Sequence, residues 1–219
     1  MTASLNQAFH RETVLGSGVG DERVVRQHGS LGVYAGIRVE VRSLARGKGT
    51  VFAWNAGANI PARFATAVAQ GVRDAISTGV LAGLELTDVL VSVEDGSYHE
   101  EDSSEAAFRE VTQRATTAAL RQAHPTLLEA ISVCRSTFPK EYASAIEESL
   151  SSEDVRIESA QSESQTSGFM VTVPTSRVDS LLQQILSVTH GQAKFLIESG
   201  GFRPRPEPPD MATVWTSVP

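Results

Sequence analysis

Alternating apolar and charged residues predict a half-buried strand in the first third of the chain. Within residues 33–42, Ile37, Val39 and Val41 fall on one face, and charged residues fall on the other. Such a strand has one face toward a core and one toward water. Other β-branched, apolar runs predict further strands at 8–14, 22–27, 50–53 and 87–93.

Two later segments carry the spacing of amphipathic helices. Pro61 opens the first, where proline is tolerated, and apolar residues then recur every three or four positions from Phe64 to Ile76. The second covers 104–122 and is rich in alanine, so it can lie close to the first helix on the same sheet face. Asp102, three residues before Glu105, suggests a capping box at its start.

The second half of the chain predicts a different unit. After His124-Pro125 stops the helix, the order is strand, helix, strand, strand, helix, strand, the ferredoxin-like βαββαβ arrangement. The expected elements are 130–138, 140–150, 155–162, 168–174, 176–188 and 192–198. The chain is therefore predicted to be α+β in two domains, 1–124 and 125–200. Residues 201–219 are rich in proline and predict an extended or disordered tail.

Composition limits the class of protein. The 219 residues are 41% hydrophobic and 21% charged, which is ordinary for a water-soluble chain, and no apolar run is long enough to span a bilayer. No secretory signal is evident at the start, and Cys134 is the single cysteine, so we expect a cytoplasmic protein without an internal disulfide. A net charge of −7 argues against a general nucleic-acid coat. The default oligomeric state is a monomer, and no membrane partner is expected.

Two glycine-rich stretches do not predict nucleotide sites. The run Gly16–Gly20 lacks the spacing of a dinucleotide fingerprint and is interpreted as a flexible turn. The stretch Arg46–Thr50 lacks the earlier glycine of a phosphate loop, because Arg42 occupies that position, and a strand follows it in place of a helix. No cofactor is expected on this chain.

The most distinctive stretch is Asp95-Gly96-Ser97-Tyr98-His99-Glu100-Glu101-Asp102-Ser103-Ser104, between a predicted strand and a predicted helix. The Asp-Gly pair is expected to end the strand. The loop could be a simple solvated connection whose acids favour the positive end of the helix. A metal site would need further histidines nearby, and none lies close in sequence. His99 paired with a neighbouring glutamate as acid and base lacks a nucleophile or cofactor motif, so an enzyme is not expected.

That stretch resembles the tip loop in the fourth domain of translation elongation factor G, written Asp-Gly-Ser-Tyr-His-Glu-x-Asp-Ser-Ser. Residues 29–35 resemble a second element of the tip, Gly-Gly-Arg-Gly-Gln-Tyr-Gly. Gly32 and Tyr34 fit it, whereas Val33 replaces a glutamine and no arginine precedes Gly32. The helix framework of 60–83 and the junction at 125–131 also resemble the family.

The resemblance implies a fold and a function. It implies a ribosomal protein S5 domain 2-like domain followed by a ferredoxin-like domain, as the ribosome-binding part of an elongation factor G-like translation factor. The family's GTP-binding domain is absent from these residues, so GTP would bind only to a separate domain. The implied partners are the ribosome's RNA, transfer RNA and messenger RNA in the decoding region during translocation. The implied contact residues are Gly32, Val33, Tyr34, Gly96, Ser97, Tyr98, His99 and Glu100.

The second domain departs from the family where the family is basic. Residues 151–155 contain two acids in place of an Asn-x-Arg-Arg-Gly run, and 189–193 lack the arginine of a Thr-Gln-Gly-Arg-Gly run. Arginine is a natural partner of RNA phosphate, and carboxylates repel phosphate. The alternative hypothesis is therefore a diverged, non-translational binding module that kept the scaffold and lost the ribosome contacts.

Overall fold

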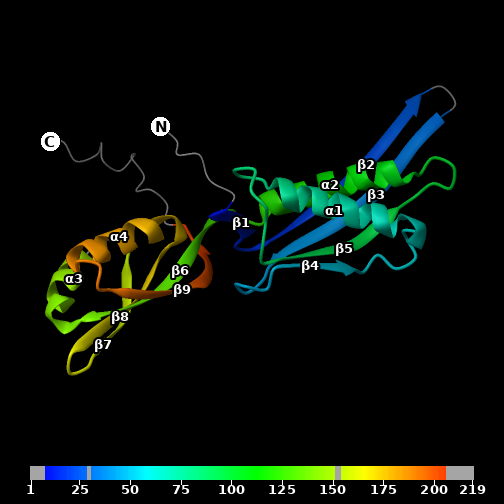
Figure 1. Ribbon diagram of the computed structural model, residues 1–219. Helices are drawn as coiled ribbons and strands as arrows, with labels where there is room; N and C mark the ends of the chain where they lie inside the picture. The colour runs from blue at the N-terminus through cyan, green and yellow to red at the C-terminus, as the bar shows by residue number, and fades with distance from the viewer. Residues whose placement is uncertain (1–7, 29–30, 151–153, 206–219) are drawn as a thin grey trace, which may run out of the picture.

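The computed structural model describes residues 8–28, 31–150 and 154–205. These residues form two units that lie end to end, each with its own sheet and its own pair of helices (Figure 1). The fold is α+β, as the sequence predicts. The long strand β6 (Pro125–Pro139) carries the chain from the first unit into the second.

The first unit is built on a sheet in the order β2-β3-β5-β4. The β2–β3 and β3–β5 pairs are antiparallel, and the edge strand β4 runs parallel to β5. The alternation of β3 is observed as predicted, because Ile37, Val39 and Val41 are buried. The strands span Ser17–His28 (β2), Leu31–Ser43 (β3), Thr50–Trp54 (β4) and Val89–Ser97 (β5).

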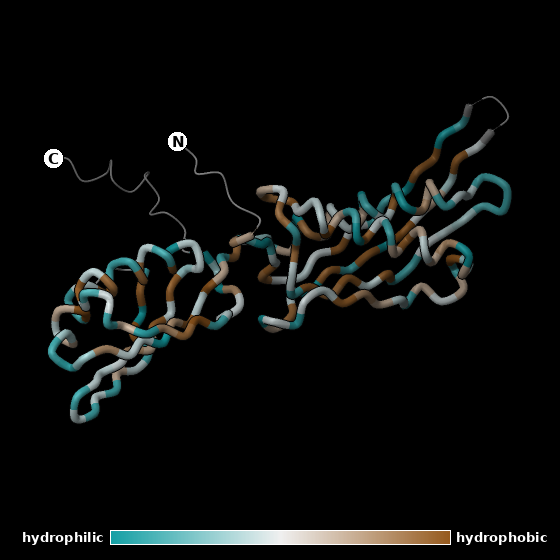
Figure 2. The backbone as a smooth tube through the Cα atoms, viewed as in Figure 1, coloured by the Kyte–Doolittle hydropathy of each residue, from teal (hydrophilic) through white to brown (hydrophobic). Residues whose placement is uncertain are grey.

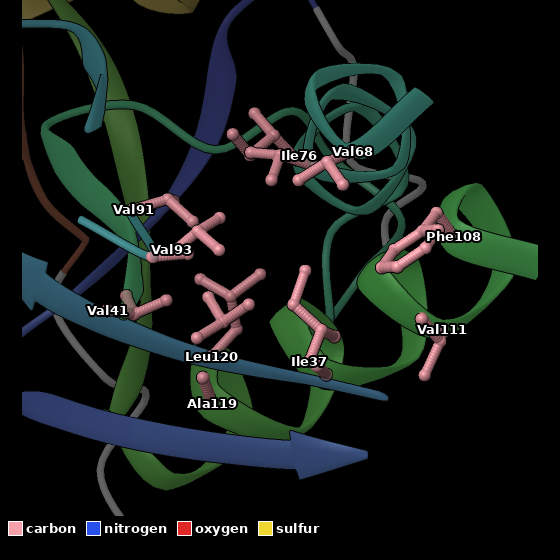
Figure 3. Close-up of a cluster of buried hydrophobic side chains, with 14 of the residues drawn as sticks. Ile37, Val41, Val68, Ile76, Val91, Val93, Phe108, Val111, Ala119 and Leu120 are labelled. Atoms are coloured by element: carbon pink, nitrogen blue, oxygen red, sulfur yellow. The ribbon is translucent and has the colours of Figure 1, made fainter. Parts of the chain in front are cut away.

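Helices α1 (Ala65–Thr78) and α2 (Glu105–Gln122) cover one face of this sheet, and a 3-10 turn, Ala62–Phe64, precedes α1. The apolar side chains of both helices meet those of β3 and β5 in one core (Figure 3). Phe64 and Phe108 stack with ring centroids 4.5 Å apart, which ties the two helix starts together. The helix pair that was predicted from spacing is therefore present and packs on a single side.

The glycine run at 16–20 is not a flexible turn, which corrects the sequence interpretation. Gly18 and Gly20 belong to β2 and pair with Val41 and Val39 of β3. A Cβ atom at Gly20 would lie 1.9 Å from the carbonyl oxygen of Ala115 in α2. The glycines are there because α2 lies directly on the backbone of β2.

The second unit has the predicted βαββαβ order, with β6, β7, β8 and β9 in one sheet and helices α3 and α4 on one face. Its separate core contains Phe138, Ile146, Phe169 and Ile185. The elements span Pro125–Pro139 (β6), Ala143–Ser149 (α3), Arg156–Ser162 (β7), Thr166–Pro174 (β8), Val178–Val188 (α4) and Lys194–Pro204 (β9), with 3-10 turns Lys140–Tyr142 and Thr175–Arg177 before the two helices.

Strand β1 (His10–Val14) joins the two units. It pairs with the start of β6, in register from His10 opposite Glu129 to Val14 opposite Pro125, and so belongs to the second sheet. Its middle residue, Glu12, also makes two backbone hydrogen bonds with the first unit. The N–H of Glu12 donates to the carbonyl of Glu85, and the N–H of Thr87 donates to the carbonyl of Glu12. Strand β1 therefore precedes the first sheet along the chain but pairs in the sheet of the second unit, because strand pairing follows space and not chain order.

The last strand runs further than expected. β9 continues to Pro204, where it pairs with Leu128, so the predicted tail does not begin at residue 201. Residues 206–219 lie outside the described part of the chain. Across residues 8–28, 31–150 and 154–205, no helix has both the length and the apolar character needed to cross a membrane.

Candidate functional site

Two segments distant in sequence meet at the end of the first unit that faces away from the second (Figure 1). One is the start of β3, residues 32–36, and the other is the end of β5 with the connection to α2, residues 96–104. The backbone N–H of Tyr34 donates to the carbonyl of Asp102 at 2.9 Å, and Gly36 pairs with Ser97. We call residues 32–36 and 96–104 together the tip.

A bulge directs the end of β5 toward the tip. The β3–β5 register shifts so that Arg38 is opposite Asp95 while Val39 is opposite Val93, which leaves Glu94 as an extra residue. Asp95 and Gly96 remain inside β5, so the Asp-Gly pair does not end the strand as predicted. The amide of Asn59, 2.8 Å away, lowers the pKa of the Asp95 carboxyl, with a smaller contribution from the Gly96 N–H.

Hydroxyl groups connect the two segments of the tip. The Tyr34 and Ser97 hydroxyl oxygens lie 2.9 Å apart. Ser103 donates its hydroxyl hydrogen to the carbonyl of Tyr34 at 2.7 Å and accepts the backbone N–H of His99 at 2.9 Å. Ser103 therefore fixes the loop's own turn and also its attachment to β3, a role that its place in the motif did not indicate.

The cap of α2 differs from the sequence prediction. Ser104 is the N-cap, with extended backbone angles, and its hydroxyl oxygen accepts the N–H of Ala107 at 3.2 Å. Asp102 does not cap the helix. Its carboxylate instead lies 3.1 Å from Nδ1 of His99.

Gly32 permits this placement of Asp102. A Cβ atom at Gly32 would lie 2.3 Å from one carboxylate oxygen and 2.4 Å from the carboxylate carbon. Any side chain at position 32 would therefore force Asp102 to move. The absence of a side chain at Gly32 lets the carboxylate pass between the two segments of the tip.

The predicted contact residues differ in accessibility. Tyr98 is 43% exposed, the His99 side chain is 57% exposed and Glu100 is also exposed, and Figure 2 shows that this connection is polar. Val33 behaves differently, because it is partly buried and packs against the apolar core. The structure thus brings all eight residues to one end of the molecule but presents Tyr98, His99 and Glu100 most openly. Asp102 and Ser103, which sequence reasoning left out of the site, hold that arrangement.

In the second unit, the described residues of the two loops that are basic in the elongation factor G family, 154–155 and 189–193, contain no lysine or arginine. In the loop at 189–193, His190 packs edge-on against Tyr142, with ring centroids 6.1 Å apart, and Gln192 donates to the Tyr142 hydroxyl at 3.4 Å. Asp154 lies 3.8 Å from Arg177. Residues 151–153 lie outside the described part of the chain.

A broad open groove of about 760 Å³ lies between α1 and α2. Arg109 donates to the carboxylate of Asp74 at 2.6 Å across it, and this bond, with a second from Gln70, lowers the pKa of Asp74. Arg109 and Asp74 therefore satisfy each other across the groove. Within the described residues, no group of three or more His, Cys, Asp and Glu side chains could hold a metal ion.

Comparison with known proteins agrees with this architecture. The family profile described as elongation factor G, domain IV, matches residues 8–124, which is the whole first unit together with β1. This chain belongs to the elongation factor G family. The matched region is domain IV and not the family's GTPase domain.

Relatives extend the match into the second unit. Elongation factor G of Dehalococcoides mccartyi is 35% identical over 198 residues in strain BAV1 and 33% identical over 198 residues in strain 195. Each alignment covers 90% of this chain and 29% of the relative, so the chain spans less than a third of the length of these elongation factors. A crystal structure of a Thermus thermophilus protein superimposes with a TM-score of 0.81 at 27% identity, covering 90% of this chain and 30% of that one.

Proposed function

We propose that this chain is the ribosome-binding part of an elongation factor G-like translation factor, acting in the cytoplasm. In this proposal the tip enters the decoding region and contacts transfer RNA and messenger RNA during translocation. The contact residues are Gly32, Val33, Tyr34, Gly96, Ser97, Tyr98, His99 and Glu100. The action is steric and uses hydrogen bonds, with no bond chemistry on this chain.

One observation carries the proposal: Tyr98 and His99 are exposed at the end of a rigidly held loop. The connection is tied to β3 by Tyr34, Ser97 and Ser103, and it lies at the pole opposite the second unit. Folding gains little from an aromatic ring and an imidazole that face water. Such side chains on an ordered loop favour contact with a partner.

The first prediction concerns His99. A chimaera would carry this chain in place of the corresponding region of D. mccartyi elongation factor G. In that protein, His99→Ala is expected to slow translocation at least about tenfold, which is a rise of about 1.4 kcal/mol in the barrier. The same change should leave the free energy of unfolding of the chain within about 0.5 kcal/mol, because the ring is exposed. Rapid-mixing translocation assays and urea unfolding provide the two measurements.

A matched control removes an imidazole at the other end of α2. His124 is exposed and has a φ of 55°, which asparagine tolerates, so His124→Asn should leave translocation unchanged. Equal slowing by both variants would contradict a specific role for the tip. If the His99→Ala chimaera binds ribosomes and translocates at the wild-type rate, the proposed contact between His99 and RNA is contradicted.

The second candidate is a non-translational binding module. The loop at 189–193 favours it, because His190 and Gln192 face Tyr142 and the loop supplies no arginine. Without such cations, attraction to RNA phosphate is weaker. Sedimentation of the chain and of the chimaera with ribosomes separates the candidates: if neither sediments with ribosomes at low salt, the binding module is favoured.

A further prediction concerns nucleotide. The chain lacks a phosphate loop, and the stretch at 46–50 leads into β4 rather than into a helix. The isolated chain is therefore expected neither to bind nor to hydrolyse GTP. Titration calorimetry with GTP and magnesium checks this, and micromolar binding would contradict it. Full-length D. mccartyi elongation factor G serves as the positive control.

A further inference from the structure

We infer that Asp102 is a positioning residue for His99, and that the pair presents the ring's outer nitrogen, Nε2, as a hydrogen-bond acceptor. The tip would then select ligand groups that donate a hydrogen bond, such as a ribose hydroxyl or a base amino or imino group, rather than phosphate oxygens. This inference rests on the proposed function in taking RNA as the ligand. The positioning role itself can be tested without a ribosome.

The charge of Asp102 favours one of the two ring nitrogens of His99 as the site of the hydrogen. Nδ1 lies 3.1 Å from a carboxylate oxygen, and a negative charge that can only accept hydrogen bonds stabilises a hydrogen on Nδ1 rather than a lone pair there. In a neutral imidazole one nitrogen donates and the other accepts. Nε2 therefore accepts, and the 57% exposure of the side chain leaves it accessible to a ligand.

The backbone holds both members of the pair before any ligand arrives. The N–H of Ser103 donates to the carbonyl of His99 at 3.1 Å, which closes the turn between them. The carbonyl of Asp102 accepts the N–H of Tyr34, and Gly32 leaves room for the carboxylate. A side chain fixed in this way loses less conformational freedom on binding, which favours affinity.

The charges around the ring disfavour phosphate. Residues 95–104 contain no lysine or arginine, while Glu100 and Glu101 are exposed beside His99. On the neighbouring strand β2, Arg26 pairs with Glu110. Arg23 lies over the Tyr34 ring of the tip, with its guanidinium carbon 6.0 Å from the ring centroid. An approaching phosphate would meet several carboxylates, whereas a hydroxyl or amino donor would not be repelled.

Nitrogen NMR of the isolated chain tests the positioning role. In wild type, the neutral ring of His99 should show a protonated Nδ1 and an unprotonated Nε2. Asp102→Ala should shift this tautomer ratio by roughly tenfold toward Nε2–H, because the negative charge 3.1 Å from Nδ1 is lost. Asp102→Asn, which keeps an acceptor oxygen but no charge, should give an intermediate ratio.

A matched control tests whether the change in tautomer ratio is specific to Asp102. Glu101→Ala removes an exposed acid next to Asp102 and should leave the tautomer ratio unchanged. Backbone amide shifts of residues 97–104 report whether each variant keeps the loop. A wild-type ring with hydrogen mainly on Nε2, or equal effects of Asp102→Asn and Glu101→Ala while the loop is retained, would overturn the positioning role.

Ribosome affinity of the chimaera tests the ligand class. The ratio of wild-type to His99→Ala affinity should hold or rise as pH increases into the range where NMR shows a neutral ring. A contact to phosphate needs the protonated ring, so a ratio that falls toward one over that range would overturn the inference. If the wild-type chimaera binds no ribosomes, the proposed function and the ligand class both fail. The tautomer measurement still decides the role of Asp102.

Discussion

Replacing Glu12 with alanine is expected to lower the free energy of unfolding by about 3–5 kcal/mol, because several backbone N–H groups would lose their acceptor and each buried donor left unsatisfied costs about 1–3 kcal/mol. Glu12 is fully buried, and its carboxylate accepts four backbone N–H groups from the loop that follows α1. These come from Val80 at 2.6 Å, Leu81 at 3.0 Å, Ala82 at 2.8 Å and Leu84 at 3.1 Å. Without the carboxylate, one buried and three partly buried N–H groups lose their acceptor.

Glu12→Gln gives a sharper form of the same test. Glutamine has nearly the same shape, but its amide nitrogen would face N–H donors and could not accept from them. Glu12→Gln should therefore also destabilise, by about 2 kcal/mol. Urea unfolding followed by circular dichroism measures both changes.

The control for Glu12 lies in the same junction. Glu85 pairs with Arg11 at 3.6 Å and its side chain is 60% exposed. Glu85→Ala should change stability by less than about 0.5 kcal/mol, because exposed ion pairs contribute little. If Glu12→Ala and Glu85→Ala had similar small effects, the four N–H contacts would not stabilise the junction.

Local periodicity predicted much of the fold. The alternation in β3, the helical spacing in α1 and α2, and the βαββαβ order of the second unit are all present in the structure. These features depend on which face of one element is apolar, and that information is contained in a short stretch of residues. The resemblance to elongation factor G supplied the arrangement of the elements.

Long-range pairing was not visible in the sequence. β1 lies next to β2 along the chain, yet it pairs with β6, more than a hundred residues later. Glu12 looks like an ordinary acid in a strand, and only the fold places its carboxylate inside the loop at 79–84. Nothing within five residues of Glu12 indicates that partner.

Local competition explains the errors at the tip. Asp102 and Ser104 could each cap α2, and the sequence spacing favoured Asp102. In the structure the Asp102 carboxylate lies beside His99, and Ser104 is the residue that caps α2. The choice depends on Gly32 and Tyr34 across the tip, which no single stretch of sequence contains.

Replacing Gly20 with alanine is expected to lower the free energy of unfolding by about 3 kcal/mol, at the upper end for an overpacked core. The new Cβ would lie 1.9 Å from the carbonyl oxygen and 2.7 Å from the carbonyl carbon of Ala115. These are backbone atoms in the middle of α2, so no side chain can rotate away. The helix would have to move off β2, which would open the core that both helices share with β3 and β5.

Gly16 provides the comparison, because it precedes the same strand. A Cβ there would meet His124 at 3.4 Å and Ala123 at 3.7 Å, which are ordinary contacts. Gly16→Ala should therefore change stability by about 0.5 kcal/mol or less, as surface substitutions usually do. Urea unfolding of both variants distinguishes the two interpretations of the run at 16–20. If it were only a flexible turn, Gly20→Ala would be as mild as Gly16→Ala; close packing of α2 on β2 requires a large difference between them.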